Sequence, residues 1–204
     1  MHIVLLGDSI FDNGPYVDAG HSVSELLAAN LKDAEISLLA VDGDVTTDVN
    51  QQLNAMPCAA THVFVSCGGN DALRSIPKIN RSANTVGGAL HILREVTEDF
   101  RLNYKAMLSS ILSKHSSPIA CTIYNRVPGL SDIAKTALSI FNEIILEEAF
   151  ALDVPIIDLR IIFNNEEDFS PVSPIEPSVH GGRKIVKRIS DIVTGDHSSL
   201  GVYT

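Results

Sequence analysis

Five short apolar runs that alternate with segments of helical periodicity most constrain the fold of this 204-residue chain. The apolar runs occupy residues 2–6, 35–41, 62–67, 118–124 and 154–159. Apolar residues recur at helical spacing in segments 21–32, 84–114, 131–152 and 182–194. Continuous apolar strands that alternate with helices are typical of a parallel sheet covered on both faces. The pattern therefore predicts one α/β domain over residues 1–204.

Several boundaries follow from local signals. The segment 84–114 is too long for a typical helix and predicts either two helices or one kinked helix. Asp132 is a candidate N-cap for the helix over 131–152. The longest irregular stretch, 164–181, is rich in proline, and long loops in compact domains are usually functional. Residues 195–204 are expected to form a loosely held tail.

The composition restricts the class of partner. At 45% hydrophobic and 20% charged residues the chain is that of an ordinary folded domain. A net charge of −10 argues against nucleic acid, because phosphate binding favours a basic surface. We see neither a basic leader with an apolar core nor a run near 18 apolar residues, and the first strand begins at residue 2. We therefore expect no signal peptide, no membrane span and a cytoplasmic location.

Cofactor and metal motifs are also missing from the sequence. The three cysteines are scattered without a Cys-x-x-Cys pair, so neither a disulfide framework nor a zinc site is expected. Cys67 and Cys121 stand in apolar runs and are expected to be buried thiols. No glycine-rich phosphate-binding motif follows a strand, so we expect no nucleotide cofactor.

Three of the predicted strands end in polar, glycine-containing motifs. These are Gly7-Asp8-Ser9, Asp42-Gly43-Asp44 and Gly68-Gly69-Asn70-Asp71. The carboxyl ends of parallel strands are where open α/β sheets place their chemistry. Gly-Asp-Ser alone also makes ordinary turns, and the local sequence is not the Gly-x-Ser-x-Gly elbow of α/β-hydrolases. The combination of a serine, a glycine and an asparagine at three strand ends is the more specific signal.

In this order the three motifs resemble the sequence blocks of the SGNH (GDSL-type) hydrolases, and the resemblance covers most of the chain. It implies a three-layer α/β/α sandwich around a five-stranded parallel sheet in the flavodoxin-like order 2-1-3-4-5. It also implies that Ser9 is the nucleophile. The oxyanion hole would consist of the backbone N–H groups of Ser9 and Gly43 and the side-chain amide of Asn70. An uncharged amide and a glycine without Cβ suit that role.

In the last block, this chain departs from the usual pattern of the family. That pattern is Asp-x-x-His-Pro, followed by glycine and an apolar helix. When the chain is aligned on the final helix, the His-Pro pair falls on Glu176-Pro177 and the aspartate position holds Ser173. When it is aligned on His180, the aspartate position holds Pro177. Neither register gives Asp-x-x-His, so the base must be chosen on chemical grounds.

A free histidine titrates near pH 6.5, whereas a free glutamate, with a pKa near 4.3, is too acidic to deprotonate serine well. His180 is the only histidine in the loop before the last helix, and Ser178 as N-cap would place it in the first turn. We therefore predict His180 as the general base, oriented by Glu176 or Asp168. A helix N-terminus disfavours imidazolium, however. The alternative is that Glu176 itself occupies the base position.

Other charged residues near these motifs have more ordinary interpretations. Asp8, Asp12 and Asp71 are expected to make turn hydrogen bonds and to frame Ser9, and their spacing does not indicate a metal site. Arg74 and Arg126 are candidates to bind a substrate carboxylate or phosphate, although surface or ion-pair roles are the plainer interpretation.

The sequence thus predicts a serine esterase that hydrolyses small acyl or aryl esters through an acyl-enzyme on Ser9, without cofactor or metal. The alternative is a binding protein of the same fold that lacks a functional histidine base. A flavodoxin-like or receiver-like switch would share the strand order. It would require an acidic cluster at the end of the first strand, and Asp8 alone supports that poorly.

Overall fold

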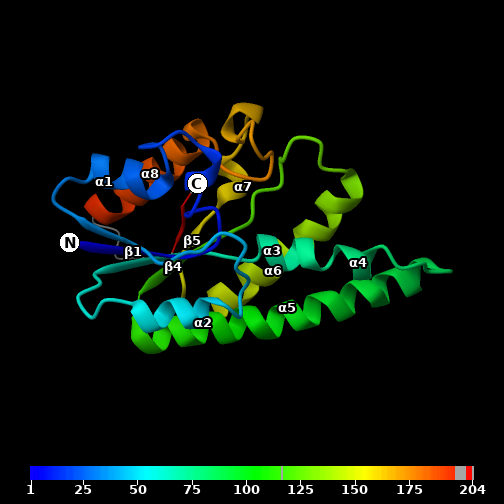
Figure 1. Cartoon of the computed structure of the whole chain (residues 1–204). Coiled ribbons are helices and arrows are strands. Elements are labelled where there is room, and N and C mark those ends of the chain that lie inside the picture. The colour runs from blue at the N-terminus through cyan, green and yellow to red at the C-terminus, as the bar shows by residue number, and fades with distance from the viewer. Residues whose placement is uncertain (116, 196–200, 204) are drawn as a thin grey trace.

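The computed structural model describes residues 1–115, 117–195 and 201–203, which form a three-layer α/β/α sandwich (Figure 1). The central sheet of the described residues has six strands, all parallel, in the order β2-β1-β3-β4-β5-β6. The strands are β1 His2–Gly7, β2 Glu35–Leu38, β3 His62–Ser66, β4 Pro118–Cys121, β5 Ile156–Ile157 and β6 Val202–Tyr203. The predicted fold and the order of its first five strands are confirmed, and a sixth strand is added.

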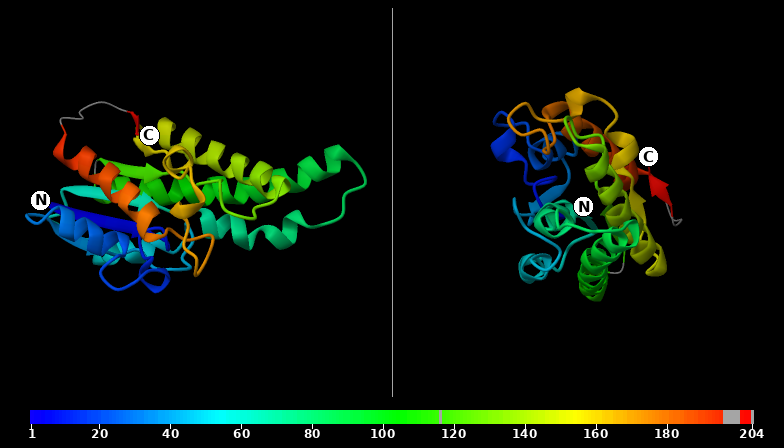
Figure 2. Two further views of the ribbon diagram at one scale, coloured as in Figure 1. Left: turned by 90° about the horizontal axis from the view of Figure 1, so that it is seen from above. Right: turned by 90° about the vertical axis from the view of Figure 1, so that its right-hand side faces the viewer.

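Helices cover both faces of the sheet, with α1 and α8 on one side and α2, α5 and α6 on the other (Figure 1). The α-helices are α1 Val23–Asn30, α2 Val49–Gln52, α3 Gly69–Arg74, α4 Ile76–Ile79, α5 Val86–Lys114, α6 Asp132–Ala151, α7 Leu159–Ile162 and α8 Val179–Thr194. The 3-10 helices are η1 Gly14–Tyr16, η2 Leu53–Ala55 and η3 Glu166–Asp168. Figure 2 shows that α4 and the start of α5 extend beyond the sheet. In the described part of the chain, no helix has the length and apolar character needed to cross a bilayer.

The sheet is buried on both faces because its strands alternate their side chains between two apolar clusters. In β1, Ile3 and Leu5 face the cluster with α1 and α8, whereas Val4 and Leu6 face the cluster with α5 and α6. All six residues of β1 are buried. Each such aliphatic side chain contributes roughly 1.5–3 kcal/mol by leaving water. This burial fixes the strand that precedes Ser9.

The turn after β1 requires a glycine. Gly7 has a φ of +117°, and a Cβ on it would lie 1.8 Å from the Ser66 carbonyl oxygen of β3. The next amide, that of Asp8, donates to the same oxygen at 3.0 Å. The close approach brings the turn that carries Ser9 against the end of β3, where the Asn70 motif begins.

Several predicted strands are shorter than their apolar runs. The amides of Leu39 and Ala40 both donate to the Leu5 carbonyl, so an extra residue interrupts the ladder and β2 ends at residue 38. β4 ends at residue 121, because Ile123 exchanges two 2.8 Å hydrogen bonds with the buried Asn142 side chain. β5 stops early because Asp158 caps α7.

Other boundaries also differ from the expectation. Segment 86–114 forms the single helix α5. Ser131, not Asp132, caps α6, and its hydroxyl accepts a hydrogen bond from the Ala134 amide. The predicted cap of α8 by Ser178 is confirmed. Within the expected tail, residues 202–203 instead pair with β5 as strand β6, whereas 196–200 and 204 lie outside the described residues. Cys67 and Cys121 are buried free thiols, as predicted.

Candidate active site

A cavity of about 360 Å³ opens at the carboxyl ends of β1, β3 and β4, at the lower end of the size range of small-molecule pockets. Three residues singled out by sequence, Ser9, Asn70 and Glu176, share it. Its wall is otherwise largely apolar. Representative apolar lining residues are Ile10, Leu73, Ile76, Ile123, Leu130 and Ile133. They come from the Ser9 turn, from α3 and α4, from the segment between β4 and α6, and from the first turn of α6.

Ser9 is held in a tight turn directly after β1 and is only 7% exposed. The amides of Phe11 and Asp12 donate to the Asp8 carbonyl, and the Ile10 amide donates to the Asp8 carboxyl at 3.2 Å. Burial raises the pKa of Asp8 well above its ordinary value, and the nearby Glu176 adds to the effect. Asp8 therefore frames Ser9 through turn hydrogen bonds, as the sequence predicted.

Helix α3 anchors the loop that follows β2 through three side chains. The Asn70 amide nitrogen donates to the Asp44 carbonyl at 2.9 Å, and the Arg74 guanidinium donates to the Gly43 carbonyl at 2.9 Å. Asp71 accepts hydrogen bonds from the Thr46 amide and hydroxyl. An amide NH₂ carries two hydrogens, so the bond to Asp44 orients Asn70 and leaves a second donor.

Sequence reasoning missed Gln52, which joins two of these strand ends. Its side-chain oxygen accepts from the Gly7 amide at 2.8 Å, and its nitrogen donates to the Gly7 carbonyl at 2.7 Å. The same nitrogen donates to the Asp44 carboxyl at 2.8 Å. No motif in the sequence marks this residue. The only signal available was a glutamine in a segment of otherwise ordinary polarity.

Glu176 lies beside Ser9 and is only 4% exposed. Burial raises the pKa of its carboxyl to about 7; hydrogen bonding with the Ser9 side chain acts in the opposite direction, and Asp42 raises the pKa further. One of its oxygens, Oε2, is buried without a hydrogen-bond partner among the described residues. A carboxyl with this pKa can exchange protons near neutral pH.

The backbone around Glu176 is held on all sides. Its amide donates to the Ser173 carbonyl at 3.0 Å, and its carbonyl accepts from the Ser170 amide at 2.8 Å. The carbonyl before it accepts from the Tyr124 hydroxyl, and the carbonyl after it accepts from the Asn13 side chain at 3.2 Å. These contacts, which come from the same loop, from the segment after β4 and from the loop after β1, fix where the carboxyl stands.

Comparison with known proteins identifies the family of this chain. The model of the GDSL-like lipase/acylhydrolase family matches residues 5–182. The chain belongs to that family. Its members are carboxylic ester hydrolases, the enzyme class that the sequence predicted. No curated protein matches the sequence.

Solved structures share the fold of this family member over nearly its whole length. A lipase from a goat rumen metagenome has a TM-score of 0.73 at 19% identity, with 96% of this chain and 99% of that chain covered. An acetyl xylan esterase has a TM-score of 0.71 at 15% identity, with 95% and 100% covered. An extracellular lipase from Streptomyces rimosus has a TM-score of 0.66 at 20% identity, with 92% and 98% covered.

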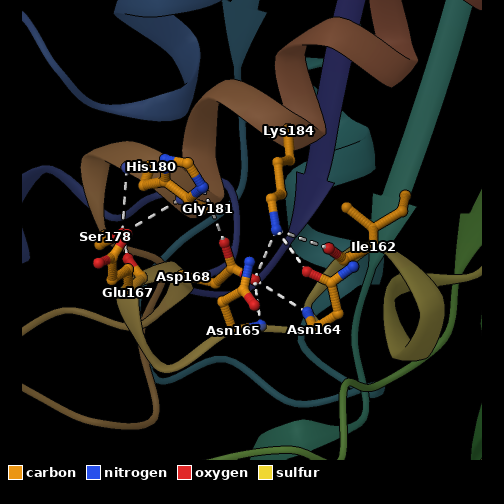
Figure 3. A network of polar contacts seen from close by, with 9 residues as sticks. All are labelled: Ile162, Asn164, Asn165, Glu167, Asp168, Ser178, His180, Gly181 and Lys184. Carbon is orange, nitrogen blue, oxygen red and sulfur yellow. Dashed lines mark hydrogen bonds and ion pairs between the residues drawn. The ribbon is translucent and has the colours of Figure 1, made fainter.

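The predicted base, His180, does not lie where the sequence analysis expected it. His180 stands in the first turn of α8 with its side chain 50% exposed, and its Nε2 lies 3.5 Å from Asp168 Oδ1 (Figure 3). The structure thus brings His180 and Asp168 together, but neither lines the Ser9 cavity. Among the described residues no histidine does, and His197 lies outside them.

Asp168 is instead an anchor for the loop and for α8 (Figure 3). It is fully buried, and its Oδ2 accepts from the Asn164 amide at 2.9 Å, the Asn165 amide at 3.0 Å and Lys184 Nζ at 2.8 Å. A Cβ on Gly181 would lie 2.2 Å from the Asp168 carbonyl oxygen. The first turn of α8 is therefore packed tightly against η3, and this packing directs His180 toward Asp168.

The remaining predicted site residues lie around the cavity rather than in it. Gly43, Arg74 and Arg126 are exposed and do not line it. Asp12 accepts a hydrogen bond from the Asp42 amide, as expected of a turn residue. Within the described ranges, no group of three or more histidine, cysteine or acidic side chains is placed to hold a metal ion.

Proposed function

We propose that this family member is a serine esterase in which the Ser9 hydroxyl attacks the carbonyl carbon of an ester. The acyl group passes to Ser9, the alcohol leaves, and water then releases the acid. The observation that carries the proposal is the meeting of Ser9, Asn70 and Glu176 at one apolar cavity on the carboxyl edge of the sheet.

Stabilisation of the oxyanion is assigned to the backbone N–H groups of Ser9 and Gly43 and to the free amide hydrogen of Asn70. The support is the anchoring of the Gly43 loop by α3, which fixes these donors before substrate arrives. Donors held in advance act on the charge that develops in the transition state without a cost of reorganisation.

The preferred substrates are proposed to be uncharged esters with an apolar acyl or aryl group. Among the described residues that line the cavity there is no lysine, arginine or histidine, and the only carboxylic acids are Asp8 and Glu176. Anionic substrates would meet these acids without a compensating cation, since Arg74 and Arg126 lie elsewhere. This argues against a carboxylate or phosphate near the reacting carbonyl.

A second candidate is a binding protein that keeps the cavity but does not turn over esters. The observation that favours it is the absence of a histidine at the cavity in the described part of the chain. The two candidates differ in whether Ser9 is activated, and a covalent probe reads that property directly.

The test is labelling with a fluorophosphonate together with hydrolysis of p-nitrophenyl esters. We expect one label, on Ser9, which disappears in Ser9→Ala together with the hydrolysis. Ser113→Ala, a substitution of an exposed serine on α5, is the matched control and should retain both. Full activity in Ser9→Ala would contradict the proposal. A parent protein that neither takes the label nor hydrolyses any ester, yet binds one, would support the binding protein.

A further inference from the structure

We propose that Glu176 is the general base of this enzyme and stands where the family pattern has its histidine. The inference rests on the proposed esterase function and adds the residue that activates Ser9. Two independent observations lead to it. Alignment on the final helix puts Glu176-Pro177 in the position of the His-Pro pair, and the structure places the Glu176 carboxyl beside Ser9 in the cavity.

The usual objection to a glutamate base is its acidity. A carboxylate with a pKa near 4.3 binds the serine proton too weakly to assist attack. Here burial raises the pKa of Glu176 to about 7, close to that of an imidazole. The fold therefore gives a carboxyl the proton affinity that general-base catalysis requires near neutral pH.

The groups that face Glu176 maintain this affinity. From the end of β1 comes Asp8 and from the end of β2 comes Asp42, whose charge raises the pKa of Glu176. From η1 and from the segment after β4 come the phenols Tyr16 and Tyr124, whose own pKa values are raised in part by Glu176. All four are acids, so none would stabilise the charged form of Glu176 as a cation does.

The geometry also orients the Glu176 carboxyl. In a Ser-His-Asp triad the third residue orients the base. Four hydrogen bonds, from the same loop, from the segment after β4 and from the loop after β1, hold the backbone of residues 175–177, so the carboxyl approaches Ser9 from a fixed point. Its Oε2 is one of four buried side-chain polar atoms without a hydrogen-bond partner among the described residues, and it is the only one of the four that belongs to a residue lining the cavity. A buried oxygen left free at a cavity is better explained by chemistry than by stability.

The proposed steps balance in protons and electron pairs. The Glu176 carboxylate takes the Ser9 hydroxyl proton as Oγ bonds to the acyl carbon, and the carbonyl electron pair moves to oxygen. Collapse of the adduct breaks the bond to the alkoxide, which leaves with the proton from Glu176. Water then attacks the acyl-Ser9 ester and gives a proton to Glu176. The second collapse releases the acid and returns the proton to Ser9.

The test compares Glu176→Gln with two matched controls, His180→Gln and the exposed Glu166→Gln in η3. Glutamine keeps the shape of glutamate but cannot take a proton. We expect Glu176→Gln to lower kcat about 10²–10⁴-fold, the usual contribution of general-base catalysis, with each control within about threefold of the parent. The parent rate should rise with pH through about 7, and this rise should disappear in Glu176→Gln.

A second readout protects the test against a purely structural effect. The rate of fluorophosphonate labelling of Ser9 should follow the same pH dependence in the parent and in His180→Gln. The inference is overturned if Glu176→Gln keeps kcat within tenfold, or if His180→Gln loses as much as Glu176→Gln, while Ser9 still labels in the parent. Absence of labelling and hydrolysis in the parent itself would instead refute the proposed esterase function.

Discussion

Asp168 and Glu176 stand in the same loop and are both buried, but their surroundings differ. Asp168 Oδ2 accepts from two backbone amides and from Lys184. Glu176 faces a hydroxyl, other acids and an apolar cavity, and no cation lines that cavity among the described residues. A carboxylate surrounded by donors stabilises a fold, whereas one deprived of them can exchange a proton. The comparison teaches that the environment of an acid, rather than its type, assigns its role.

On the proposed mechanism, the same contrast explains why Glu176 rather than His180 is the base, despite the suitable chemistry of a histidine. The His180 side chain pairs with the structural acid of the loop, because α8 begins at Ser178 and packs tightly against η3. Glu176, two positions before Ser178, lines the cavity instead. The predictions below test whether the Glu176 side of the loop controls rate and the Asp168 side controls stability.

The largest effect among these predictions is expected at Asn70, which lines the same cavity as Ser9. Asn70→Ala should lower kcat roughly 10²–10³-fold with little change in KM, because the amide acts on charge present only in the transition state. Steady-state kinetics with a p-nitrophenyl ester measures this. An unchanged kcat would remove Asn70 from the oxyanion hole.

On the structural side, Asp168→Asn should reduce the free energy of unfolding by about 3–5 kcal/mol, because it leaves Lys184 without its buried partner. Denaturant titration measures the loss, and the kcat of the folded protein should stay within a few-fold of the parent. A variant as stable as the parent but inactive would reverse the roles assigned to the two acids.

The difference in stability between the parent and Glu176→Gln should change with pH in a defined direction. The folded pKa of about 7 lies above the ordinary value of 4.5, so the folded state binds more protons between these values. Stability of the parent therefore falls as pH rises from about 4.5 through about 7. Glutamine removes this loss, and Tm at pH 8 should rise by roughly 2–6 °C. At pH 4 the two proteins should melt alike, and equal melting at pH 8 would contradict the raised pKa.

The smallest effect concerns the cavity wall. If the acyl chain occupies the cavity, each added methylene should increase kcat/KM about fourfold until the space is full, since burial of one CH₂ is worth about 0.8 kcal/mol. Ala134→Phe, which fills the wall on α6, should move the preferred p-nitrophenyl ester to a shorter chain. An unchanged preference would place the acyl group outside the cavity.

The strands, their order and the three polar strand ends could be predicted because periodicity and motif spacing are local properties of sequence. Ser9 and Asn70, which line one cavity in the structure, were singled out in this way. Strand β6 was missed because two residues carry no periodicity, and Gln52 because its role depends on a contact with Gly7 across 45 positions. The role of Glu176 could not be decided, because its pKa depends on burial that only the folded chain creates.

The central claim is that Glu176 takes the serine proton, and the most direct measurement is the titration of its carboxyl. NMR of protein carrying ¹³C-carboxyl glutamate, recorded for the parent and Glu176→Gln, identifies the signal by its loss in the variant. We predict that this carboxyl titrates at about pH 7, at the midpoint of the pH–kcat/KM profile. A Glu176 carboxyl that titrates near pH 4.5, with the kinetic midpoint still near 7, would contradict the account.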